Sequence, residues 1–65
     1  MRLTEFWERM RGRFGAGYAD SVARDQVIRR LDNRTINEAL AAGEQPKDVW
    51  RAVCEHFEIP VADRH

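Results

Sequence analysis

The sequence has one cysteine, two prolines and no long apolar run among its 65 residues. A single cysteine cannot form an internal disulfide, and no set of possible ligands has the spacing of a metal site. The opening stretch, MRLTEFWERMRGRF, carries arginine and glutamate where a secretory signal needs an apolar run. No segment approaches the ~20 apolar residues of a membrane-spanning helix. We therefore expect a cytoplasmic protein without membrane association, whose thiol stays reduced.

The chain is short and has a net charge of zero, but its charge is unevenly spread. A chain of 65 residues makes one domain, 1–65, and buries only about 60% of its unfolded surface, so it depends on tight packing or self-association. Residues 1–31 hold seven arginines and four acids, a net of +3, whereas residues 32–65 hold four basic residues and seven acids, a net of −3. The basic half could attract an acidic partner. Pairs at helical spacing, such as Glu5 with Arg9, make a solvated helix surface the simpler interpretation.

Apolar residues recur with the period of an α-helix, and no stretch has a strong strand signal. We expect an all-α fold, a compact bundle of three to four short helices. The pattern predicts helices over residues 4–14, 18–31, 36–42 and 46–57, followed by a frayed tail over 60–65.

Local signals support several of these helix ends. Thr4 is a suitable N-cap for the first helix, and Thr35 with Glu38 has the spacing of a capping box. Pro46 suits the first position of the fourth helix. Gln26 falls within the apolar arc of the second helix, so we expect its side chain to be buried with a hydrogen-bond partner.

The stretch VWRAVCEHF holds the single cysteine, two positions from one of the two histidines. Two helical positions separate side chains by about 200°, so Cys54 and His56 point to different sides of the helix. A nucleophilic cysteine needs a base within hydrogen-bond reach. We therefore expect Cys54 to be a small core residue, and we expect no catalytic residue, metal ligand or cofactor-binding group.

The two tryptophans of the chain are expected in different places, one in the core and one in a surface that binds a partner. Trp7 lies in a narrow apolar arc and is expected in the core. The fourth helix has a wider arc of about 140°, which a domain this small can hardly cover. We expect Trp50 to be partly exposed beside Cys54, with Arg51 at the border, as a patch that binds a partner.

Four stretches, MRLTEFWERMRGRFG, YADSVARD, RTINEAL and PKDVWRAVCEHFEIP, resemble a small actinobacterial family, domain of unknown function 3046, whose members begin MRLTEFW. The resemblance covers almost the whole chain and implies a compact helical domain of cytoplasmic proteins. It implies no activity and no catalytic residues. Family members often carry histidine in place of Gln26, which argues against any role that needs an imidazole there. Genes of the family often lie close to those of the DNA-recombination machinery, which gives a DNA-related function some weight.

The lack of catalytic, metal-binding and phosphate-binding motifs favours a non-enzymatic cytoplasmic adaptor or regulator that binds another protein, and self-association stays open. The alternative is a DNA-binding regulator, linked to recombination or repair, that uses a helix-turn-helix-like segment over 35–53. Gln45, Lys47 and Arg51 would then face DNA. Against this alternative, Glu44 occupies a turn position that usually carries an apolar residue. The segment also lies in the acidic half, whereas DNA binding depends on neutralised phosphates.

Overall fold

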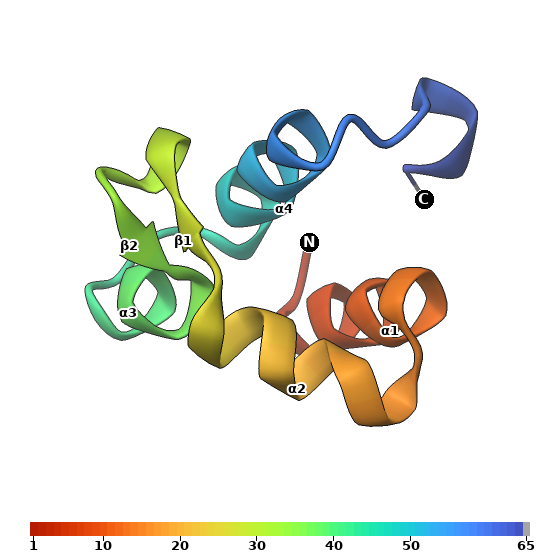
Figure 1. Ribbon diagram of the computed structural model, residues 1–65, viewed down its shortest axis with the longest axis horizontal. Coiled ribbons are helices and arrows are strands. Elements are labelled where there is room, and N and C mark those ends of the chain that lie inside the picture. The colour runs from red at the N-terminus through yellow and green to blue at the C-terminus, as the bar shows by residue number, and fades with distance from the viewer. Residues whose placement is uncertain (65) are drawn as a thin grey trace.

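A computed structural model, shown in Figure 1, describes residues 1–64. Its helices, strands and 3-10 turns (η) are, in chain order, α1 (Leu3–Phe14), α2 (Ala16–Asp25), β1 (Val27–Ile28), η1 (Arg29–Leu31), β2 (Arg34–Thr35), α3 (Ile36–Ala41), α4 (Pro46–His56) and η2 (Val61–Asp63). Figure 1 shows α1 and α2 joined by a tight turn, with α4 across from them and the hairpin beside α3 at the end away from α1. The segment after α4 extends on the same side of the molecule as α1.

Three of the helices lie within one residue of the ranges expected from the sequence. The capping box is present at α3, because the Glu38 N–H donates to Thr35 Oγ1 at 3.1 Å and the Thr35 N–H donates to Glu38 Oε1 at 2.8 Å. Pro46 occupies the first turn of α4, as its missing N–H allows. Helix α1 begins one residue before Thr4, and its N-cap is Arg2, without a side-chain hydrogen bond.

The helix expected over 18–31 is wrong beyond Asp25, so the fold is mostly helical and not all-α. Helix α2 ends because Gln26 adopts an extended backbone, with φ −86° and ψ 117°. The Gln26 side chain is exposed, contrary to the expectation that it is buried. The chain then enters the β1–β2 hairpin, in which Val27 lies opposite Thr35. Both of these residues are β-branched, a type that favours extended backbone.

Two polar residues make the hairpin turn possible. Asp32 and Asn33 have φ of 58° and 59°, the left-handed conformation that these residue types tolerate best after glycine and that type I′ turns require at two successive positions. Arg34 then holds the hairpin in place. Its Nε donates to the Leu31 carbonyl at 2.9 Å, and its Nη2 donates to the Glu44 carboxylate at 2.6 Å, which ties the hairpin to the α3–α4 connection.

The core lies where the four helices and the hairpin meet. Helix α4 is its centre, because nearly half of its residues are buried. The buried apolar residues are Phe6, Met10, Ala19, Val22, Ala23, Ile28, Leu31, Ile36, Ala39, Val49, Trp50, Ala52, Val53, Cys54 and Ile59. A chain this short draws its stability from such a set, since each apolar side chain removed from water contributes about 1.5–3 kcal/mol before chain entropy is counted.

Helices α3 and α4 end in the same hydrogen-bond pattern. At α3 the Glu44 N–H donates to the Ala39 carbonyl and the Gly43 N–H donates to the Leu40 carbonyl, both at 3.1 Å. Gly43 takes the left-handed position with φ 94°. This arrangement is the Schellman motif, which satisfies carbonyls that have no partner inside the helix.

At α4 the Ile59 N–H donates to the Cys54 carbonyl at 2.9 Å and the Glu58 N–H donates to the Glu55 carbonyl at 3.3 Å. Here the left-handed position belongs to Glu58, with φ 53°. The reversal at Glu58 returns the chain to the core, where Ile59 is buried. The tail expected to be frayed over 60–65 therefore contains an ordered 3-10 turn, while His65 lies outside the described residues.

Candidate functional site

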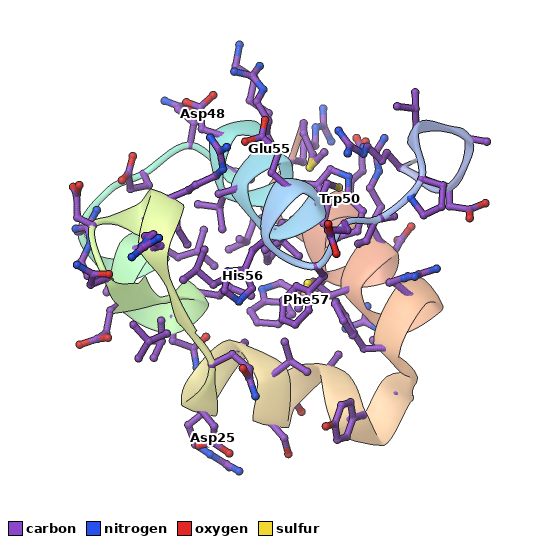
Figure 2. All side chains as sticks on the ribbon, turned by 45° about the horizontal axis from the view of Figure 1, so that its top comes forward. Asp25, Asp48, Trp50, Glu55, His56 and Phe57 are labelled. Carbon is purple, nitrogen blue, oxygen red and sulfur yellow. The ribbon has the colours of Figure 1, made fainter. Side chains whose placement is uncertain are left out.

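The exposed patch expected at Trp50 and Cys54 is wrong. Trp50 is 5% exposed and Cys54 is 1% exposed, while Arg51 is exposed. The cause is the segment after α4, which returns over the Trp50 side of the wide apolar arc, the side that was expected to face solvent. Figure 2 shows Trp50 on the side of α4 toward this segment, with Asp48 and Glu55 on the outer side.

Trp50 connects three parts of the chain. Its indole Nε1–H donates to the Arg64 carbonyl at 2.9 Å, and its ring lies edge-to-face on Phe6 of α1, with 6.2 Å between the ring centroids. Arg9, also on α1, donates from Nη1 to the same Arg64 carbonyl at 3.5 Å. A buried indole needs an acceptor for its N–H, and the C-terminal segment supplies it.

Trp7 takes the place that the sequence analysis expected for Trp50. It is half-buried at the edge of the core and lies edge-to-face on Phe6, with 5.2 Å between the ring centroids. The expectation that Trp7 is fully buried is therefore wrong. Trp50 is therefore the core tryptophan and Trp7 is the partly exposed one, the reverse of the expectation from the sequence.

Cys54 and His56 do not form a pair. Burial raises the pKa of the Cys54 thiol, and the nearby guanidinium groups of Arg64, Arg9 and Arg13 only partly oppose this rise. His56 is exposed at the end of α4, and its ring lies edge-to-face on Phe57 with 4.8 Å between centroids. Within residues 1–64, no hydrogen bond joins the thiol to an imidazole. A thiol of this kind is a poor nucleophile.

The segment over 35–53 forms two helices joined by a short turn, as the DNA-binding alternative requires. The side chains of Gln45, Lys47 and Arg51 are all exposed. Glu44, which was unusual for such a turn, has a structural role here because it pairs with Arg34.

The outer face of α4 is mixed in charge. Asp48, Arg51 and Glu55 line a shallow hollow, into which Arg30 of η1 also reaches. Arg30 pairs with Glu55 at 2.7 Å. The carboxylates on either side of Arg51 reduce the positive potential that a DNA phosphate would meet.

A larger groove lies between α1 and the C-terminal segment, with a volume of about 770 Å³. The α1 wall carries both carboxylates and guanidinium groups, and the other wall adds the carboxylate of Asp63. Its lining residues are Glu5, Glu8, Arg9, Gly12, Arg13, Ala62 and Asp63. The arginines of this half are evident in the sequence but the groove is not, since its second wall exists only after the chain turns back at Glu58.

Gly12 is the groove residue that the fold explains least. It stands inside α1, where glycine is about 1 kcal/mol less favourable than alanine. A Cβ added at this position would meet no other atom within 4 Å. The packing of the described chain therefore does not require a glycine here. A helix backbone without a side chain in the lining of a groove allows another chain to approach closely.

Two further observations limit the chemistry of the described part of the chain. Within residues 1–64, no group of three or more histidine, cysteine, aspartate or glutamate side chains is placed to hold a metal ion. No helix among these residues is long and apolar enough to cross a membrane.

A family model described as "Protein of unknown function (DUF3046)" matches residues 1–62. The match confirms the family resemblance drawn from the four sequence stretches. No curated protein and no solved structure matches the chain.

Proposed function

Since the chain belongs to the DUF3046 family, whose description gives no activity, we propose from its surface that it is a small non-enzymatic adaptor or regulator that binds another protein. The contact surface in this proposal is the groove between α1 and the C-terminal segment. The proposal also places the protein in the cytoplasm, where the single thiol of Cys54 would stay reduced.

The observation that carries the proposal is the combination of charge and bare backbone in the groove. The two groove-lining carboxylates of α1, Glu5 and Glu8, come before its two groove-lining arginines, Arg9 and Arg13, so the negative groups lie toward the N-terminus of the helix and the positive groups toward its C-terminus. Such an arrangement selects a partner segment with the opposite order of charges, because complementary charges set specificity and register at an interface. Gly12 lets that segment approach the helix without a side chain between them.

A photo-crosslinking residue placed at Gly12 tests the proposal in the native cytoplasm. The open space around Gly12 accommodates the probe. The matched control carries the probe at Lys47, which is exposed on α4 away from the groove. We expect a discrete crosslinked species from position 12 that is absent from position 47 and is lost when Arg13→Glu is added. Equal crosslinking at both positions, or crosslinking at position 47 alone, would overturn the groove as the contact surface.

Self-association is a specific form of the same proposal. Two copies of α1 packed antiparallel would place Glu5 of one copy near Arg13 of the other, since the two residues lie on the same groove-lining face. Crosslinking from Gly12 would then give a product with twice the monomer mass. Sedimentation of the purified protein would show a dimer that Arg13→Glu weakens and that the double variant Glu5→Arg with Arg13→Glu restores.

DNA binding through segment 35–53 stays as a second candidate because Gln45, Lys47 and Arg51 are exposed on α4 and its preceding turn. A role in recombination or repair would fit this candidate. Its test is a gel shift at low salt with Lys47→Ala and Arg51→Ala as variants. Binding that both variants weaken, and that salt weakens further, would support it. Binding that is unchanged by either variant would remove it.

A further inference from the structure

The segment Pro60–Arg64, here called the C-terminal strap, covers Trp50 without burying any side chain of its own. Pro60, Val61, Ala62 and Asp63 are exposed, with Val61 at 75%, and Arg64 is half-buried. Ile59, directly before the strap, is the last residue of the chain in the core. The strap is therefore held by polar contacts and not by apolar burial.

Those contacts are few. Within the strap, the Asp63 N–H donates to the Pro60 carbonyl at 2.8 Å. Arg64 makes the links to the rest of the protein: its Nε donates to the Ile59 carbonyl at 2.8 Å, and its own carbonyl accepts from Trp50 at 2.9 Å. Hydrogen bonds at an exposed segment exchange readily with water, so a segment with no buried side chain opens more easily than the helices beneath it.

The group that the strap inserts is a single oxygen. Two donors from different helices converge on the Arg64 carbonyl: the Trp50 indole N–H and, at the longer distance of 3.5 Å, the Arg9 guanidinium. The indole can only donate, and in the closed form it is almost fully buried, so it needs the acceptor that the Arg64 carbonyl supplies. With the strap open, water or a ligand oxygen would take that place. One of the two donors is a cation, and cationic donors form stronger hydrogen bonds with ionised acceptors than with neutral carbonyls. Arg13 lines the same groove as Arg9, together with the carboxylates of Glu5, Glu8 and Asp63.

We propose that the strap is a removable cover over a carboxylate-binding site formed by the Trp50 indole N–H and the Arg9 guanidinium, and that the Arg64 carbonyl holds this site in the closed form. The ligand class is an aspartate or glutamate side chain of an acidic peptide segment. Tryptophan and arginine, the types of the two residues that form this site, are among those that contribute most often to binding hot spots. The inference goes beyond the adaptor proposal, although the two surfaces share Arg9: the groove needs Ala62 and Asp63 of the closed strap as its second wall, whereas the carboxylate site needs the strap open.

The first arm of the test measures strap opening in the unmodified chain by native-state hydrogen exchange, with NMR detection. The Trp50 indole proton should exchange at least about tenfold faster, relative to its intrinsic rate, than the α4 amides of Val53 and Cys54. Arg64→Ala, which removes the bond to Ile59, should speed exchange of the indole proton several-fold and leave both amides unchanged. The control Arg24→Ala removes an exposed pair with Asp25 on α2 and should change none of the three. Exchange of the indole at the rate of the core amides would show that it opens only on global unfolding and would overturn the proposal.

The second arm identifies the ligand class by titration with tetraglutamate, and with tetraglutamine as the neutral control. Tetraglutamate should shift the Trp50 indole resonance in a saturable way, and tetraglutamine should not. Arg9→Gln should abolish the shift, while Arg51→Gln, which changes an exposed arginine on α4 outside the site, should retain it. Equal shifts with both peptides, or a shift that survives Arg9→Gln, would overturn the carboxylate site. An absent shift with tetraglutamate in the Arg64→Ala variant, whose strap opens more often, would overturn it as well.

Discussion

Replacing Glu58 with glycine should stabilise the protein. Glu58 follows α4 and holds the left-handed position of the Schellman motif with φ 53°, whereas Gly43 holds the same position after α3. A left-handed conformation costs a residue with a Cβ about 1–2 kcal/mol, and the extra freedom of glycine in the unfolded chain offsets about 0.5–1 kcal/mol of that gain. The carboxylate adds a second cost, since a negative charge at a helix C-terminus is unfavourable by about 0.3–1 kcal/mol.

The two terms together predict that Glu58→Gly raises the free energy of unfolding by about 1–2 kcal/mol. Glu58→Ala separates them, because it removes the charge but keeps the Cβ, and it should gain only about 0.3–1 kcal/mol. The reciprocal change Gly43→Ala should lose about 1 kcal/mol. Urea denaturation followed by far-ultraviolet circular dichroism measures all three. For a domain of this size, whose slope is about 1 kcal/mol per molar urea, the Glu58→Gly midpoint should rise by about 1–2 M.

The comparison of the two variants decides the argument. If Glu58→Gly is no more stable than Glu58→Ala, the cost of the left-handed backbone at position 58 does not exceed the entropy that glycine loses on folding, and the reasoning from φ fails. If Glu58→Ala gains as much as Glu58→Gly, the gain at position 58 comes from charge alone, and a neutral Gly43→Ala would agree with that result. Equal slopes of the urea transitions are the control that the variants unfold from the same native fold.

Three further predictions concern the core and the helix ends. Trp50→Ala should destabilise the protein by about 3–5 kcal/mol and Trp7→Ala by clearly less, because Trp50 is 5% exposed and hydrogen-bonded whereas Trp7 is half-buried. Urea denaturation of both variants gives their order, and a larger loss for Trp7→Ala would contradict the assignment. The Cys54 thiol should react with a disulfide reagent far more slowly than free cysteine at every pH near neutrality, because burial raises its pKa and restricts access. The control is the same protein unfolded in urea, and a thiol that reacts equally fast in the folded and unfolded protein would refute the burial. The pKa of Glu38 is lowered by hydrogen bonds from the Thr35 backbone and side chain, so its contribution is present above the unfolded value of 4.5 and is lost as the pH falls through the lower folded value. Wild type should therefore lose stability relative to Glu38→Gln in that acid range, and parallel pH profiles would contradict this.

The sequence was most informative where a helix end depends on neighbouring residues. The capping box of Thr35 and Glu38 and the proline at the start of α4 act within a few positions, so their effect can be read without knowing the rest of the fold. The second helix was predicted too long for a related reason. Its apolar residues drift around the helix, which suggested two neighbours, but Val27 is 53% exposed and only Ile28 and Leu31 enter the core. The apolar residues changed position on the expected helix because the chain leaves the helical conformation after Asp25.

A signal for that change was present. Val27 and Ile28 are β-branched, and the adjacent Asp32 and Asn33 are residue types that accept positive φ. Two-residue strands are too short to produce alternation, so the helical period dominated the pattern. The groove and the burial of Trp50 could not be predicted in this way, because both depend on the chain reversal at Glu58, a residue type that rarely takes a left-handed backbone.

The width of the apolar arc on α4 and the polar attachment of the strap lead to one conclusion about Trp50. An arc this wide needs more cover than α1, η1 and α3 provide, and the remaining cover comes from the C-terminal segment. Ile59 covers its part by apolar burial, but the strap covers the indole edge through hydrogen bonds alone. In the proposed open form, the indole edge of Trp50 would face solvent, while Ile59, which precedes the strap, would stay in the core. The exposed patch expected from the sequence is therefore wrong because the C-terminal segment completes the cover of the arc, and the indole exchange experiment tests how firmly the strap holds that cover in place.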